Sequence, residues 1–500
     1  MILPILLLVP FAAGVLSAVA WSRRIMEVLN VGAFGITFVL SLIIAGRVLT
    51  NGPVSYWGGF LYADALSALV SLLTASVALV CAVYAVSYLR AEEQSGALDD
   101  DGLAQYRKYY SLTPLFVFAM LLVGVANNLG VMWVAIEATT LASVFLVTFY
   151  GKVTSLEAAW KYAIIGGVGL SMALFGTVVA YYSAHRLAGS DTLAGLNWSV
   201  LAAQATQLDK TAMRLAFILV LLGYGTKAGL APMHTWKPDA YSEAPVPSAA
   251  ILSTAMLNCA LYGLIRFYVL TSRSLGPEFP GGLLLLIGIL SMGIAVPFIL
   301  LQKNFRRLLA YSSIDQAGIM AIALGVGGNM GALALMLHMT YHTVAKSLLF
   351  LCAGNVYQHY KTDLFAKVKG GILRAMPITG VVFLLAMVAV AGMPPFSLFQ
   401  SEFLIVRAAL DGGHYLTTAL FVLFGAGIFA GLLVRVGGLV LGDGGETPAA
   451  ALDPWRHVPI LTLAGVLVVL AFYLPKPLLD LIRSASSVVA GGSQWVFRAS

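Results

Sequence analysis

Stretches of about 20 apolar residues recur along the whole chain, and this repetition constrains the fold more than any other feature. Each stretch is long enough to cross a hydrocarbon layer of roughly 30 Å. We count about fourteen of them, the first centred near Val15 and the last near Val466. Only 10% of the 500 residues are charged and 60% are hydrophobic, so a soluble domain of this size would lack a polar surface. The sequence therefore predicts an all-α, polytopic protein embedded in a lipid bilayer.

The formal net charge of +7 comes mostly from short loops between the apolar stretches. Taken alternately from the N-terminus, the loops of one side hold more Lys and Arg, among them Arg23, Arg24 and Arg107. The positive-inside rule makes that side cytoplasmic and places both termini outside. We expect a bacterial or archaeal cytoplasmic (inner) membrane, and no nucleic-acid partner. Only Lys227 and Lys346 are assigned to the interior of spans.

Two of the predicted spans are interrupted by glycine and proline. One break contains Pro232, within residues 223–236, and the other contains Pro394 and Pro395, within residues 391–403. Proline removes a backbone donor and frees carbonyls that need another partner. The breaks fall in spans 7 and 12. Because these spans are five apart, an odd number, equivalent spans would run in opposite directions. Interrupted helices at matching positions of two inverted halves are typical of an ion site in a transporter.

Six ionisable residues are placed at membrane depth, where each costs about 2.5–3.5 kcal/mol on insertion scales. They are Glu137, Lys227, His338, His342, Lys346 and Glu402. Lys227 lies five residues before Pro232, and we predict that it carries protons while the charge of Glu137 influences it. A fixed salt bridge at Glu137 and a purely structural Lys227 are the alternatives.

His338, His342 and Lys346 are spaced at i, i+4 and i+8, which on one helix places them on a single face. The stripe would span roughly 12 Å at about 1.5 Å per residue. Because histidine titrates near neutral pH, we predict a proton relay. A zinc-binding histidine pair and two plainly hydrogen-bonded core histidines are rival readings, although Lys346 would repel a metal ion.

The second break is followed about two turns later by Glu402, which is expected to exchange protons with the outer side or, alternatively, to anchor its helix. Asp315 near a span end is a possible accessory group, and Asp64 is expected to be an interface residue. His234 and Lys237 are placed at the cytoplasmic edge. There they would form a proton entry or, equally, surface salt bridges.

The three cysteines are isolated within apolar segments and form no CxxC pair, at Cys81, Cys259 and Cys352. The sequence therefore predicts neither an iron–sulfur cluster nor a structural zinc site. We expect no metal-binding, cofactor-binding or catalytic residues in this chain.

Several segments together resemble the antiporter-like, proton-conducting subunits of respiratory complex I. They are residues 227–245, 308–313, 338–350 and 391–403. Within that superfamily the chain is most similar to component F of hydrogenase-4 type complexes, which are membrane-bound [NiFe] hydrogenase or formate hydrogenlyase assemblies. The residues that carry this closer likeness are 136–141, 157–162, 256–260 and 393–396.

The resemblance implies fourteen core helices with two inverted five-helix repeats. The expected parts are residues 1–110 with helices 1–3, 111–275 and 276–440 with the repeats, and 441–500 with the last helix and the tail. It also implies that Glu137 pairs with Lys227, that the 338–346 stripe is the central relay, and that Glu402 is the terminal exchange residue.

The implied function is redox-driven proton (or Na⁺) translocation by a subunit that is itself not redox-active. Its partners would be other antiporter-like and small membrane subunits and a peripheral redox arm carrying iron–sulfur clusters and a NiFe or quinone site. The chain departs from many relatives at Asn258, where they have a lysine. A multi-subunit cation/proton antiporter and a structural anchor that no longer pumps are the alternatives.

Overall fold

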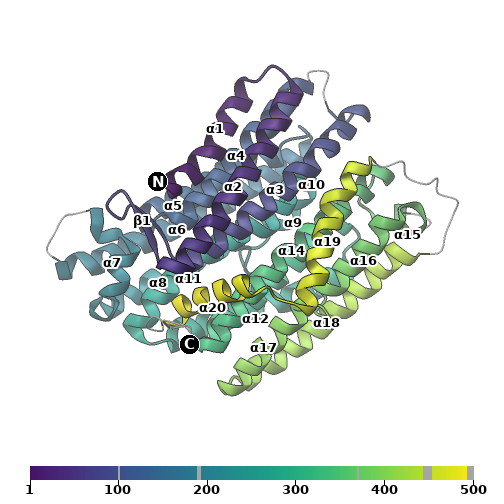
Figure 1. Ribbon diagram of the computed structural model, residues 1–500. Coiled ribbons are helices and arrows are strands. Elements are labelled where there is room, and N and C mark those ends of the chain that lie inside the picture. Colours follow the sequence, from purple (N-terminus) through teal and green to yellow (C-terminus); the bar gives the residue numbers. More distant parts are fainter. Residues whose placement is uncertain (99–101, 189–192, 369–370, 443–452, 492–500) are drawn as a thin grey trace.

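The computed structural model describes residues 1–98, 102–188, 193–368, 371–442 and 453–491 (Figure 1). These residues are almost entirely helical, and the strands among them form one short hairpin of β1 (Val54–Tyr56) and β2 (Leu61–Ala63). The predicted all-α membrane architecture is confirmed.

The first third of the chain contains α1 (Ile2–Val19), α2 (Arg23–Asn51), α3 (Ala65–Gln94), α4 (Gly102–Val125), α5 (Leu129–Val147) and α6 (Val153–Ala188). The middle contains η1 (Leu193–Leu196), α7 (Trp198–Ala203), η2 (Ala205–Gln207), α8 (Lys210–Ala228), α9 (Trp236–Glu243), α10 (Val246–Ile251), the π-helical turn η3 (Leu252–Met256), α11 (Leu257–Leu275), α12 (Glu278–Leu301) and α13 (Phe305–Val326). The last part contains α14 (Gly328–Tyr360), η4 (Phe365–Lys367), α15 (Ile372–Ala375), α16 (Pro377–Val390), α17 (Ser397–Asp411), α18 (Tyr415–Leu441), η5 (Pro454–Arg456), α19 (His457–Phe472) and α20 (Lys476–Ala490).

Twelve helices in the described part are long and apolar enough to cross a membrane. Two further crossings predicted from the sequence coincide with α14, which is 33 residues long, and with the interrupted pair α16–α17. Helices α10 and α11 form a single crossing through η3. The apolar stretches of the sequence thus each correspond to a helix or a broken helix.

The crossings differ sharply in how much of their surface the protein itself covers. The most apolar stretches of residues 246–275 and of α13 are 100% and 94% buried inside the protein, whereas the most apolar stretch of α18 is only 28% buried. Helices buried on all sides lie at the centre of a bundle, and helices with exposed apolar sides face lipid or other subunits. The polar side chains carried by the central helices and by α14 are therefore shielded from the bilayer.

Close backbone contact between α6 and α8 fixes the surroundings of Lys227. A Cβ added at Gly223 would lie 2.5 Å from both the Cβ of Ala173 and the carbonyl oxygen of Gly169, so α8 meets α6 where neither helix has a bulky side chain. Small residues let membrane helices approach this closely. Tyr162 of α6 and Lys227 of α8 are thereby brought together.

The C-terminal helix α20 does not continue the bundle but packs across α3 and α14 (Figure 1). Its inward face consists of Leu481, Ile482, Ala485 and Val489, while Arg483 is exposed. Residues 443–452 and 492–500, which belong to the fourth expected part of the chain, lie outside the described residues.

Candidate functional site

The first helix break ends α8 at Ala228 and begins α9 at Trp236. Gly229 stops α8 because its φ of +77° is left-handed, a conformation that glycine adopts without a steric penalty. Pro232 lies in the segment between the helices. The carbonyls freed at the end of α8 find side-chain donors: Trp236 Nε1 donates to Thr226 at 3.0 Å and Lys237 Nζ donates to Ala228 at 2.7 Å.

Lys227, in the last turn of α8, is 1% exposed. Its Nζ donates to Thr140 Oγ1 on α5 at 2.8 Å and to Tyr162 OH on α6 at 2.6 Å. Glu137 lies about one helical turn before Thr140, and its Oε2 is buried without a hydrogen-bond partner among the described residues. The hydrogen bonds of Lys227 thus go to two hydroxyls rather than to Glu137. Sequence reasoning did not assign Tyr162 to the site.

The two groups placed at the cytoplasmic edge are both buried. His234 is 6% exposed and Lys237 is 0% exposed, and Lys237 Nζ bonds to the carbonyl of Ala228 inside the protein. The surface salt bridge expected as one alternative for Lys237 is wrong, because α9 turns back against the end of α8 and carries this side chain inward. The surface ion pairs belong instead to Asp239, which contacts Lys161 at 3.2 Å and Arg307 at 2.6 Å.

The 338–346 stripe lies on α14 with all three side chains fully buried. The rings of His338 and His342 are stacked with centroids 6.5 Å apart. Lys346 Nζ donates to the Leu309 carbonyl at 3.0 Å and to Ser312 Oγ, both on α13. In the described part of the chain, neither ring nitrogen of His342 has a hydrogen-bond partner.

His338 connects α14 with two other helices. Its Nδ1 lies 2.9 Å from Ser401 Oγ on α17, and its Nε2 lies 2.9 Å from Gln316 Oε1 on α13. Gln316 Nε2 donates in turn to Asp315 Oδ2 at 3.2 Å. A hydrogen-bonded path therefore runs from His338 through Gln316 to the carboxylate of Asp315.

Asp315, Gln316 and Glu402 line one cavity of about 390 Å³ at the second helix break. The break ends α16 at Val390 and begins α17 at Ser397, with Pro394 and Pro395 between them. Other walls come from α18, at Phe421, Val422, Gly425, Ala426, Ile428 and Phe429. The cavity thus joins two carboxylates to the least covered helix of the bundle.

The backbone of the second break lies directly against Glu402. Gly392 has a φ of +69°, and a Cβ added there would lie 2.2 Å from Glu402 Oε2. Glycine is therefore favoured at this position by its conformation, and any larger residue would displace the Glu402 carboxylate.

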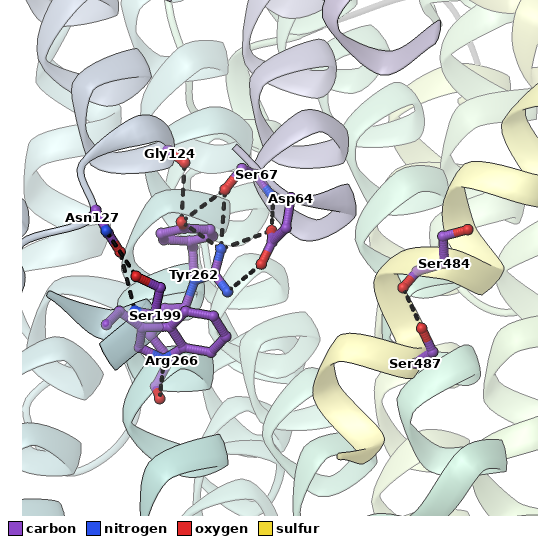
Figure 2. Close-up of polar contacts among 10 residues, drawn as sticks. Asp64, Ser67, Gly124, Asn127, Ser199, Tyr262, Arg266, Ser484 and Ser487 are labelled. Atoms are coloured by element: carbon purple, nitrogen blue, oxygen red, sulfur yellow. Dashed lines mark hydrogen bonds and ion pairs between the residues drawn. The ribbon is translucent and has the colours of Figure 1, made fainter. Parts of the chain in front are cut away.

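A buried ion pair that the sequence did not suggest joins the N-terminal helices to α11 (Figure 2). Arg266 NH1 and NH2 contact the carboxylate of Asp64 at 2.7 and 2.8 Å, and NH2 also donates to Ser67 Oγ at 3.0 Å and Tyr262 OH at 2.8 Å. The guanidinium lies 4.0 Å from the ring centroid of Trp198. Arg266 is therefore a further cation inside a span, which corrects the assignment of Lys227 and Lys346 alone.

No group of three or more His, Cys, Asp or Glu side chains among the described residues is arranged to hold a metal ion. The arrangement instead offers side chains that are able to hold and release protons near the breaks and in the polar interior. They are Glu137, Lys227, Lys237, Asp315, His338, His342, Lys346 and Glu402. Buried polar groups without protein partners are normally hydrogen-bonded to water.

Residues 126–429 match the family described as NADH:quinone oxidoreductase/Mrp antiporter, TM. A hydrogenase-4 component F homolog of Methylacidiphilum infernorum (isolate V4) is 35% identical over 491 residues, which cover 96% of this chain and 98% of that protein. A chain of the membrane-bound sulfane sulfur reductase, an archaeal respiratory membrane complex, has the same fold, with a TM-score of 0.85, 24% identity, and coverage of 98% of this chain and 97% of that one. A chain of the Mrp complex from Dietzia sp. DQ12-45-1b matches with a TM-score of 0.85, 20% identity, and the same coverage of 98% and 97%.

Proposed function

Because the chain belongs to the NADH:quinone oxidoreductase/Mrp antiporter transmembrane family, we propose that it is a membrane-arm subunit that translocates protons, coupled to electron transfer in partner subunits. The observation that carries the proposal is the set of buried titratable side chains that extends from one helix break to the other. Each such group is costly at membrane depth, and a chain retains them where they are paired, hydrated or functional.

Lys227 and Lys346 are the proposed proton carriers of the two halves. Each ammonium is held by oxygens: hydroxyls of Thr140 and Tyr162 for Lys227, and the Leu309 carbonyl and a serine hydroxyl for Lys346. Neutral oxygens accept a hydrogen bond from an ammonium without fixing its charge, unlike a carboxylate. Such a lysine is able to alternate between ammonium and amine.

His338 and His342 form the proposed relay between Lys346 and the second break, and Glu402 is the proposed exchange group. Gln316 hydrogen-bonds His338 and lines the cavity shared by Asp315 and Glu402, so it holds His338 beside that cavity, where water would carry the proton. Asp315 would accept or release protons in the same cavity. Glu137 would influence Lys227 by its charge, across the turn of α5 that carries Thr140.

The two breaks also support a proposed division of the chain into inverted repeats at 111–275 and 276–440. The α8–α9 break and the α16–α17 break occur in crossings that run in opposite directions by the order of the spans. The charge distribution supports a bacterial or archaeal cytoplasmic membrane with both termini outside. The proposed partners are further antiporter-like and small membrane subunits and a redox arm that holds iron–sulfur clusters and a NiFe or quinone site.

The test is proton translocation by the purified complex in proteoliposomes, measured per electron transferred. Lys227→Ala and Lys346→Ala should each abolish translocation. Removal of the Lys227 amine should leave the protein folded, because Tyr162 OH keeps its contact with Ser143 Oγ at 2.8 Å. Lys210→Ala, an exposed lysine at the start of the same helix α8, is the matched control and should pump normally. Undiminished pumping in either alanine variant would reject the proposal.

A cation/proton antiporter is the second candidate, because the Mrp chain matches this fold with the same TM-score as the respiratory chain. Both candidates use the same buried groups and differ in what drives them. Ion exchange that depends on an applied Na⁺ gradient and proceeds without electron transfer would favour the antiporter.

A further inference from the structure

Between the two proposed half-sites, the position at which a carrier is expected on α11 is occupied by Asn258. Its Nδ2 donates to Thr343 Oγ1 at 2.8 Å, one residue from His342 on α14. An amide does not titrate, so Asn258 offers no proton carrier between Lys227 and the stripe on α14. A continuous path needs another titratable side chain in this region.

Lys237 is a buried cation without a role in the proposed translocation. It is the second residue of α9, at 0% exposure, directly after the first break. The neighbouring Trp236 stacks on Tyr162 with ring centroids 4.4 Å apart and directs the start of α9 into the protein. The amine of Lys237 bonds to the carbonyl of Ala228, the residue that follows Lys227.

The backbone of the break is shaped to admit this side chain. A Cβ added at Gly229 would lie 2.6 Å from Lys237 Cδ and 2.9 Å from its Nζ. Lys237 therefore fills the space beside the αL turn that ends α8, next to Lys227. Helix α9 also packs against α13, whose Leu309 carbonyl holds Lys346, and the ring of Tyr241 on α9 lies 5.9 Å from the ring of Phe350 on α14. Lys237 therefore lies on the helix that connects the first break with the helices around the stripe.

The contacts of Lys237 differ from those of a structural lysine. In the described part of the chain, its ammonium has one hydrogen bond, to a neutral carbonyl, and no carboxylate within salt-bridge distance. A buried charge is normally retained with an ion-pair partner, as Arg266 is with Asp64. Two of the three ammonium donors of Lys237 remain for mobile partners such as water.

We propose that Lys237 is the proton carrier that links the Lys227 site to the His342–Lys346 stripe. In the transfer, the Lys237 ammonium gives one proton, through water, to a neutral ring nitrogen of His342 and becomes an amine. It then regains a proton from the Lys227 ammonium, which becomes an amine in turn. One proton moves at each step, no electrons are exchanged, and the total charge of the three groups is conserved. The inference rests on the proposed function.

The experiment compares two variants that separate proton transfer from the structural hydrogen bond. Lys237→Gln keeps an N–H donor for the Ala228 carbonyl but does not titrate, and Lys237→Met keeps neither property. Each is measured in the reconstituted complex for proton translocation per electron, beside Lys227→Ala. Lys161→Gln is the matched control, because Lys161 is an exposed lysine that contacts Asp239 of the same helix α9.

Both Lys237 variants should lose proton translocation by about a hundredfold, the low end of what a positioned proton-transfer group contributes, while Lys161→Gln pumps normally. Normal pumping by Lys237→Gln with loss in Lys237→Met would show a structural donor and overturn the inference. Normal pumping by both, with loss in Lys227→Ala, would overturn the inference and leave the proposed function standing. If Lys227→Ala also pumps normally, the proposed function itself fails. Should Lys237→Met not assemble, Lys237→Gln decides alone.

Discussion

The ion pair between Asp64 and Arg266 gives the sharpest test of how this bundle is held together, and Asp64→Asn is the perturbation. Asparagine has the same shape, and it is as good an N-cap as aspartate, so the hydrogen bond from Ser67 N, at 3.0 Å, should remain. The substitution therefore removes the negative charge, and it also replaces the oxygen that accepts from Arg266 NH1 by an amide nitrogen, which cannot accept. Arg266, 2% exposed, would stay in the interior without its counter-charge.

Removing one partner of a buried ion pair costs about 3–5 kcal/mol, because the other charge is left uncompensated. The remaining contacts of Arg266 with Ser67, Tyr262 and the Trp198 ring favour the lower end, so we expect a loss of about 3 kcal/mol in the free energy of unfolding. Asp64→Asn combined with Arg266→Met removes both charges. The double variant should be less destabilised than the sum of the single variants by about 2–3 kcal/mol.

The assay is equilibrium unfolding of the purified protein in mixed micelles with an increasing fraction of SDS, followed by tryptophan fluorescence. The control is Asp209→Asn, because the exposed Asp209 caps α8 by accepting from Ala212 N at 2.7 Å. It should change stability by less than about 0.5 kcal/mol. Additive costs in the double variant, or a loss below about 1 kcal/mol for Asp64→Asn, would show that the pair is not the buried charge unit inferred here.

Three further outcomes follow from the packing. Gly223→Ala should lower the free energy of unfolding by about 1–3 kcal/mol, because the added methyl group overpacks α8 against α6. Gly32→Ala is the control, because a Cβ at Gly32 has no neighbouring atom within 4 Å, and equal unfolding curves for the two variants would contradict the close contact. Gln316→Leu should reduce proton translocation per electron, because it removes the hydrogen bond that holds His338 beside the cavity of Asp315 and Glu402, and an unchanged ratio would exclude that positioning role. A membrane-permeant maleimide should label the native protein only after unfolding, because all three cysteines are buried, at Cys81, Cys259 and Cys352.

The sequence by itself determined the class of architecture and the local arrangement of several groups. The recurring apolar stretches correspond to the helices, because the length of a crossing is set by the thickness of the bilayer. The spacing of His338 and His342 was sufficient to place them on one face, since helical periodicity is a local property. Glycine and proline marked where α8 and α16 end, because they act on the backbone at their own positions.

Only the tertiary structure decided which of these groups meet. Lys227 is held by residues 65 and 87 positions away, and Asp64 meets Arg266 across 202 positions. The inward direction of Lys237 depends on how α9 folds back on the end of α8. Because lipid is as apolar as the interior of the bundle, an apolar helix gives no sign of which face is buried. The contacts therefore follow from the packing of distant spans, which local sequence patterns do not specify.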